Sequence, residues 1–118
     1  QNPFAVILCC SDSRVAPEII LDQGIGDLFV IRVAGNIIND EILGSIEFSR
    51  TKLQTKLIMV LGHQHCGAII EASKSTEVTG HIQSVINAVT PAVQQAEKLP
   101  GDLVDNAIRE TGPYDGTY

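Results

Sequence analysis

Aromatic side chains and long apolar runs are scarce in this chain of 118 residues. Phe, Tyr and Trp make up 4% of the sequence and tryptophan is absent, which argues against stacking platforms for bases or sugars. No apolar run approaches the ~20 residues that span a bilayer. The first residues, QNPFAVILCC, also lack the charged start and the cleavage site of a signal peptide. The sequence therefore predicts neither a membrane span nor a membrane partner.

Cysteine and basic residues are also few. The three cysteines, Cys9, Cys10 and Cys66, are an odd number and too few for a disulfide-stapled secreted domain, and no Cys-x-x-Cys pair is present. They favour a reducing compartment, and we expect the cytoplasm, with an organelle or microcompartment as the alternative. Lys and Arg total 8 against 14 Asp and Glu, so the formal net charge is −6. This acidic balance argues against a nucleic-acid partner.

The sequence is rich in aliphatic residues, and 44% of it is hydrophobic, which is enough to form the core of one domain. Three short, nearly continuous apolar runs predict buried parallel strands at residues 4–9, 28–33 and 57–61. Apolar positions at helical spacing predict helices at residues 40–53 and 81–99, the latter with a kink or a restart at Pro91. Shorter helices are predicted at residues 17–21, where Pro17 suits a first helical turn, and at residues 67–74. The alternation predicts an α/β fold, with an open, mostly parallel sheet flanked by helices.

Two loops that follow predicted strands carry the reactive side chains. The sequence CSDSR at residues 10–14 follows the first strand, and GHQHCG at residues 62–67 follows the third. Ligands bind outside the carboxyl ends of the strands in an open α/β sheet, so the loops meet if these strands are parallel neighbours. Cys10, His63 and Cys66 would then present two thiolates and one imidazole. That is the ligand set of a catalytic zinc with a fourth position open for water.

Each of these residues also has a structural interpretation when it is taken alone. A cysteine at the end of an apolar strand is usually a small buried hydrophobe, which is the interpretation we give Cys9. His63 alone is compatible with a hydrogen-bonded loop residue, and Asp12 with Arg14 is compatible with an ordinary ion pair. His65 is not expected to bind a metal together with His63, because their side chains point in different directions. Their combination on two converging loops favours the metal site.

The pair of motifs Cys-x-Asp-Ser-Arg and His-x-x-Cys-Gly resembles the zinc site of the β-class carbonic anhydrases. The resemblance continues through GDLFVIRVAGN at residues 26–36 and SIEF at residues 45–48. It is strong over residues 1–75 and looser to about residue 110. It implies that residues 1–118 form a single catalytic domain without the family's N-terminal helices and part of its C-terminal region. Tyr114 and Asp115 resemble a remnant of a later strand.

The resemblance also implies roles for individual residues. Cys10, His63 and Cys66 would hold one Zn²⁺ per subunit, with Asp12 and Arg14 as the catalytic pair beside it. In a closed form of the site, Asp12 would itself be the fourth zinc ligand. The implied substrate pocket is lined by four further residues, Gln1, Phe29, Ala34 and Gly67.

The implied reaction is the reversible hydration of CO₂ to bicarbonate and a proton. The implied assembly is a homodimer or a dimer of dimers, with Gln1 and Phe29 facing a partner chain. Two other functions stay open. One is a hydrolase of carbon disulfide or carbonyl sulfide, because relatives with similar ligands act on these substrates. The other is a non-catalytic subunit stabilised by zinc, against which the Asp12–Arg14 pair argues, since a structural site would use four protein ligands.

Overall fold

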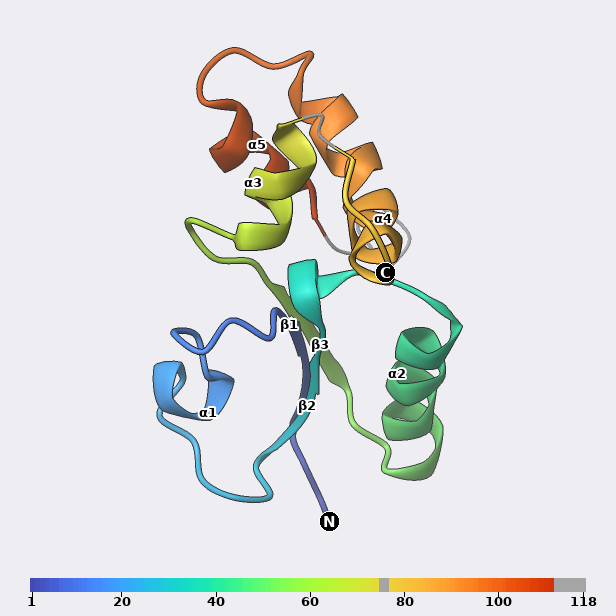
Figure 1. Ribbon diagram of the computed structural model, residues 1–118. Helices are drawn as coiled ribbons and strands as arrows, with labels where there is room; N and C mark the ends of the chain where they lie inside the picture. The colour runs from blue at the N-terminus through green and yellow to red at the C-terminus, as the bar shows by residue number, and fades with distance from the viewer. Residues whose placement is uncertain (75–76, 112–118) are drawn as a thin grey trace.

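A three-stranded parallel sheet lies at the centre of the computed structural model, which describes residues 1–74 and 77–111 (Figure 1). The strand order is β2-β1-β3, with β1 at Ala5–Cys9, β2 at Leu28–Arg32 and β3 at Leu57–Leu61. Cys9 at the end of β1 pairs with Arg32 on one side and Leu61 on the other. The predicted α/β fold is confirmed, and the first and third strands are parallel neighbours as expected.

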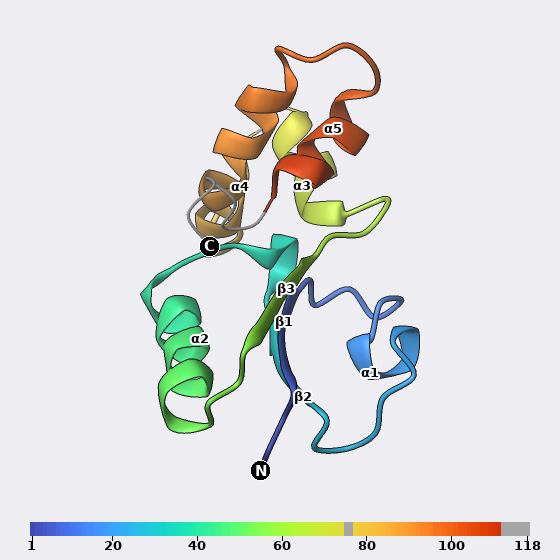
Figure 2. The same ribbon diagram turned by 180° about the vertical axis from the view of Figure 1, so that it is seen from behind.

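Helices surround this sheet on both faces and beyond its carboxyl edge. Figures 1 and 2 show α1 and α2 on opposite faces of the sheet, and α3, α4 and α5 grouped past the carboxyl ends of the strands. Their bounds are Pro17–Ile20 for α1, Asp40–Lys52 for α2, Gly67–Ser73 for α3, Ile82–Ala96 for α4 and Leu103–Glu110 for α5. A short 3₁₀ turn, η1 at Ala34–Asn36, follows β2. In the part of the chain that the structure describes, no helix is both long and apolar enough to span a bilayer.

Local signals in the sequence set several helix ends. The Asn39 side chain accepts a hydrogen bond of 2.9 Å from the Ile42 N–H and caps α2. The α5 helix was not predicted as a separate element, and Asp102 caps it by accepting from the Asp105 N–H.

The restart expected at Pro91 does not occur, because α4 runs continuously through this residue. Buried side chains on both sides of Pro91 keep the two halves of α4 packed against one core, which overrides the local preference of proline.

The strands differ in burial. All five residues of β1 are buried, whereas Leu57 and Met59 of β3 are 50% and 38% exposed. The prediction that all three strands are buried is therefore wrong for β3. β3 lies at an edge of the described sheet, and Leu57 lines an open cavity of about 990 Å³ beside it. The expected strand remnant at residues 114–115 lies outside the described residues.

Candidate metal centre

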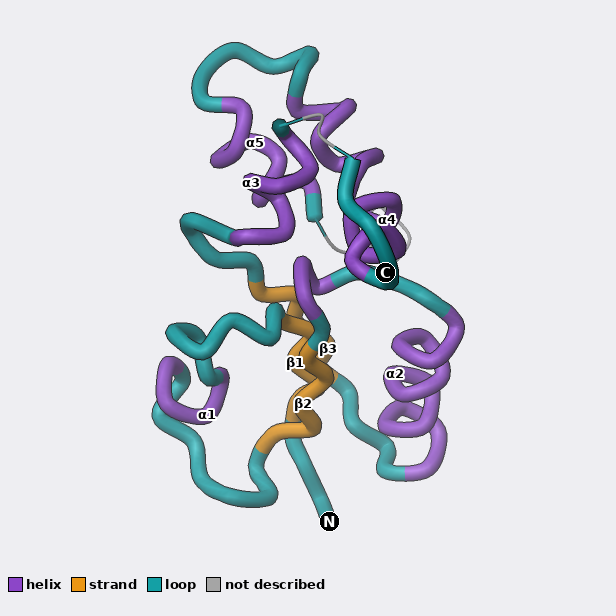
Figure 3. Tube along the Cα trace, in the orientation of Figure 1, coloured by secondary structure: helices purple, strands orange, loops and turns teal. Residues whose placement is uncertain are grey.

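The two reactive loops leave the sheet at the same end, because β1 and β3 are parallel neighbours (Figure 3). Cys10 follows the last residue of β1 directly, while His63 and Cys66 lie in the loop between β3 and α3. The two sulfur atoms and one ring nitrogen of these residues all lie within 4.8 Å of one another. Cys10 and Cys66 are only 5% and 2% exposed. The structure thus brings together the three residues that the sequence singled out as metal ligands.

His63 is oriented with one ring nitrogen free. Its Nδ1 lies 2.8 Å from the backbone oxygen of Gln64, and this contact requires the hydrogen to be on Nδ1 because a carbonyl only accepts. In the neutral ring with this tautomer Nε2 carries a lone pair, and this atom is buried and has no hydrogen-bond partner in the described residues. A buried nitrogen left without a partner is costly unless something else satisfies it. A metal ion at Nε2 would do so, with the Gln64 carbonyl fixing the ring from behind.

Cys66 lies at the N-terminus of α3, where it is the residue before the first helical turn. Burial is the main cause that raises the pKa of its thiol, and the nearby Cys10 raises that pKa further. The nearby backbone N–H groups of Ala68 and Ile69 act in the opposite direction and lower this pKa. Two thiolates this close would repel each other, and a cation between them would stabilise both. This donor chemistry fits Zn²⁺, which binds thiolate sulfur and imidazole nitrogen.

Beside the cluster, Arg14 holds the Asp12 carboxylate with two side-chain donors. Nε donates to Oδ1 at 2.9 Å and Nη2 donates to Oδ2 at 2.7 Å, while the Arg14 backbone N–H also donates to Oδ1 at 2.9 Å. These contacts hold the pKa of Asp12 well below its usual range. Nη2 also donates to the His65 backbone oxygen at 3.2 Å and thereby joins the two loops.

The position of Asp12 bears on the two forms of the site that the resemblance implies. Its Oδ2 lies 3.9 Å from His63 Nε2, so the carboxylate borders the cluster. The group of converging ligand atoms comprises Cys10, His63 and Cys66, and Asp12 is held by Arg14 instead. In this structure Asp12 is therefore a neighbour of the cluster and not one of its converging ligand atoms.

The four expected pocket residues fall into two pairs. Ala34 begins η1 just past the carboxyl end of β2, and Gly67 begins α3 next to Cys66, so both lie near the cluster. Gln1 precedes β1 at the opposite end of the sheet, where Figure 1 shows the N-terminus. Phe29 lies near the start of β2 and stacks on Phe48 of α2, with ring centroids 6.3 Å apart. The structure does not bring Gln1 and Phe29 to the cluster of their own chain.

Two residues around the cluster were not singled out from the sequence. The Gly35 N–H lies 3.3 Å from Cys10 Sγ and donates to it. Arg32 donates to the backbone oxygens of Cys10 and Asp12. Both lie in the stretch at residues 26–36 that carries part of the resemblance. That stretch was the available signal, but it gave no reason to choose these two positions.

Comparison with known proteins matches most of the described chain to one family. A family model described as carbonic anhydrase matches residues 5–111. A carbonic anhydrase from Mycolicibacterium smegmatis is 45% identical over 109 residues, which is 89% of this chain and 53% of that protein. Carbonic anhydrase 2 from Mycobacterium tuberculosis is 50% identical over 97 residues, covering 79% of this chain and 47% of that protein. The chain thus spans about half the length of these relatives.

Solved structures give the same result for the fold. The β-carbonic anhydrase CcaA superposes with a TM-score of 0.78 at 35% identity, covering 93% of this chain and 56% of that one. A tetrameric β-carbonic anhydrase from Sordaria macrospora superposes with a TM-score of 0.79 at 25% identity, and the match covers 93% of this chain and 59% of the Sordaria chain. The range matched by the family model, residues 5–111, includes both loops of the cluster.

Proposed function

This chain belongs to the carbonic anhydrase family, and we propose that it is a zinc enzyme of the β class that hydrates CO₂ reversibly to bicarbonate and a proton. The observation that carries the proposal is the convergence of Cys10, His63 and Cys66, with the Asp12–Arg14 pair against it. The match of the family model to residues 5–111 supports one catalytic domain in this chain. The three free cysteines support a reducing compartment such as the cytoplasm.

Cys10, His63 and Cys66 would hold one Zn²⁺ per subunit. The buried Nε2 of His63 has no hydrogen-bond partner in the described residues, and the two thiols beside it are soft donors that zinc prefers. Bound zinc would supply water activation, because it lowers the pKa of a bound water toward about 7. Three protein ligands with a fourth position open are typical of catalytic zinc, whereas structural zinc is usually enclosed by four.

Asp12 would orient the attacking water by accepting one of its hydrogens. The pKa of this carboxyl is held well below its usual range by Arg14, so Asp12 stays ionised at neutral pH and is only an acceptor. Arg14 occupies both carboxylate oxygens through a planar, two-donor contact and prevents the carboxylate from rotating. An oriented acceptor leaves the oxygen lone pair of the water directed at the substrate carbon.

The substrate pocket would be completed by a second copy of the chain. Ala34 and Gly67 lie near the cluster of their own chain, whereas Gln1 and Phe29 lie at the other end of the sheet. A homodimer or a dimer of dimers would let Gln1 of one subunit reach the site of another. The Gln1 amide would then donate to a substrate oxygen as negative charge grows there.

Stopped-flow CO₂ hydration with a pH indicator tests this function on the zinc-loaded intact protein, with carbon disulfide and carbonyl sulfide assayed in parallel. We expect CO₂ hydration that is abolished by removal of zinc. Hydrolysis of carbon disulfide or carbonyl sulfide without CO₂ hydration would assign a different substrate. Zinc binding with none of the three activities would point to a non-catalytic subunit.

Two neighbouring cysteines provide a matched pair of variants. Cys9 and Cys10 are both buried, but only Cys10 belongs to the ligand cluster. Cys9 packs with Ala5 and Ile7 on another part of the core. Cys10→Ala should lose both zinc and activity, while Cys9→Ala should keep both, with only a small loss of stability from the missing sulfur. Zinc retained by Cys10→Ala would contradict the assigned ligand set.

A further inference from the structure

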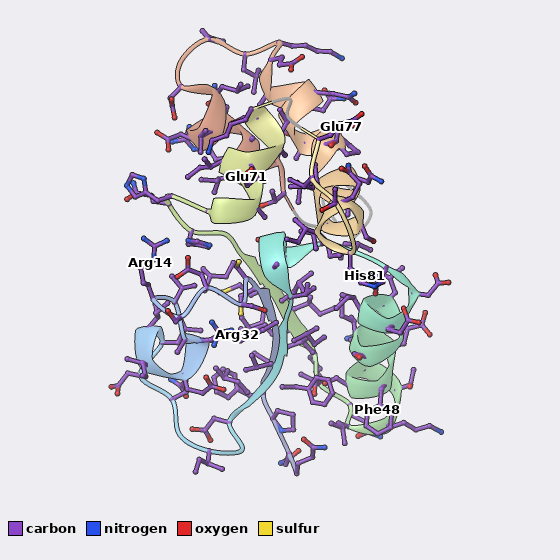
Figure 4. All side chains as sticks on the ribbon, viewed as in Figure 1. Arg14, Arg32, Phe48, Glu71, Glu77 and His81 are labelled. Carbon is purple, nitrogen blue, oxygen red and sulfur yellow. The ribbon has the colours of Figure 1, made fainter. Side chains whose placement is uncertain are left out.

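Arg32, the last residue of β2, reaches across the end of β1 to the loop that carries Cys10 and Asp12. Its Nε donates to the Cys10 backbone oxygen at 2.9 Å, and its Nη2 donates to the Asp12 backbone oxygen at 2.6 Å. Figure 4 shows Arg32 between the sheet and α1, well separated from Arg14, which lies further out. The two arginines therefore contact the same loop from different sides.

The backbone ladder between β1 and β2 ends just before this loop. Cys9 pairs with Arg32 in register, and the Val33 N–H donates to the Cys9 oxygen at 3.1 Å. After that bond, the Arg32 side chain donates the next hydrogen bond, to the backbone oxygen of Cys10, the residue that follows β1. It then shares the Asp12 oxygen with the Val15 N–H, which lies 3.2 Å away. The guanidinium thus replaces backbone hydrogen bonds for Cys10 and Asp12, which lie beyond the end of β1.

We propose that Arg32 is a positioning residue of the metal centre, because its two donors fix the backbone of Cys10 and Asp12 relative to each other. This inference rests on the proposed function, in which Cys10 binds zinc and Asp12 orients the attacking water. A guanidinium is planar, and its donors have a fixed separation, so holding both carbonyls sets the distance between them. Cys10 supplies a ligand sulfur and Asp12 supplies the acceptor for water. Arg14 fixes the Asp12 carboxylate, whereas Arg32 fixes the main chain from which it projects.

Hydrogen exchange in the metal-free intact protein tests the proposal without any activity measurement. In Arg32→Met, the peptide containing the Arg14 and Val15 amides should exchange at least ~10-fold faster, because both amides donate to Asp12. Arg50→Met is the matched control. Arg50 also donates from its side chain to a backbone oxygen, that of Thr55 at 3.3 Å, but it does so on α2, away from the cluster. This control should leave exchange in residues 10–15 unchanged.

Cobalt substitution and a conservative variant provide the second test. In Arg32→Met, the visible spectrum of bound Co²⁺ should shift in position or intensity, and kcat for CO₂ should fall ~10-fold or more with zinc still bound. Arg32→Lys keeps the charge and one donor but loses the planar pair, so it should give intermediate exchange and intermediate kcat. It also remains informative if Arg32→Met fails to fold.

The outcomes separate this inference from the proposed function. A wild-type protein that binds Co²⁺ but does not hydrate CO₂ would overturn the function, while exchange and the Co²⁺ spectrum would still report on Arg32. If both Arg32 variants match Arg50→Met in exchange, Co²⁺ spectrum and kcat, the positioning role is wrong. If Arg32→Lys lies between the wild type and Arg32→Met in exchange and in kcat, the planar two-donor contact contributes beyond the charge and the role is supported.

Discussion

Gly35→Ala should destabilise the protein through two separate effects at the 3₁₀ turn after β2. Gly35 has φ +70°, a left-handed conformation that costs an L-residue roughly 1–2 kcal/mol. An added Cβ would lie 2.8 Å from Val89 Cγ1 and 3.2 Å from Ala68 Cβ. Relieving such overpacking typically costs about 1–3 kcal/mol. The two effects together predict a loss of roughly 2–5 kcal/mol in the free energy of unfolding.

Two other glycines separate these effects experimentally. Gly80 has φ +72° but nothing within 4 Å of an added Cβ, so Gly80→Ala should lose only the roughly 1–2 kcal/mol of backbone strain. Gly44 lies within α2, also with nothing within 4 Å, so Gly44→Ala should gain about 0.5–1 kcal/mol from helix propensity. Urea denaturation of the metal-free proteins, followed by far-UV circular dichroism, measures all three.

The stabilities of Gly35→Ala, Gly80→Ala and the wild type test the two effects separately. Equal losses in Gly35→Ala and Gly80→Ala would show that Val89 and Ala68 move aside without cost. A Gly35→Ala protein as stable as the wild type would refute both effects. Gly35→Ala should also weaken zinc binding, because the Gly35 N–H donates to Cys10 Sγ and the turn must shift to relieve the contact. Gly80→Ala should leave zinc affinity unchanged.

Three further outcomes are expected for the proposed enzyme. Asp12→Asn should keep zinc by metal analysis and lose at least ~100-fold in kcat, because the amide cannot replace the ionised acceptor held by Arg14; unchanged turnover would remove Asp12 from the mechanism. Because burial raises the pKa of the Cys66 thiol, this group is protonated at neutral pH and must lose its proton to bind zinc. Below that pKa, its contribution should strengthen zinc affinity about 10-fold for each unit by which the pH rises. Calorimetry in buffers of different ionisation enthalpy should show the released proton, and a pH-independent affinity would contradict this ionisation. Sedimentation should show a dimer or larger assembly, and Gln1→Ala should lower kcat without loss of zinc, whereas an active monomer would exclude a pocket completed by a partner.

The sequence predicted the strands better than it predicted their surroundings. The three apolar runs identify β1, β2 and β3 because aliphatic, β-branched residues recur there over lengths typical of strands. Burial was overestimated at Leu57 and Met59, since a strand's own residues do not determine which elements cover its faces. Similarly, Pro91 indicated a kink or a restart, and the packing of α4 overrides the restart. The eight-residue helix α5 gave too short a pattern to be assigned alone.

The cluster could be predicted because only one topological fact was needed. Because β1 and β3 are parallel neighbours, the loops that follow them lie at the same end of the sheet. This places Cys10 beside His63 and Cys66. The supporting contacts are of another kind, because each depends on where one atom lies. Neither the reach of Arg32 to two carbonyls nor the approach of the Gly35 N–H to a sulfur follows from spacing. Topology therefore selects which residues meet, and these hydrogen bonds across the end of the sheet determine how closely their geometry is held.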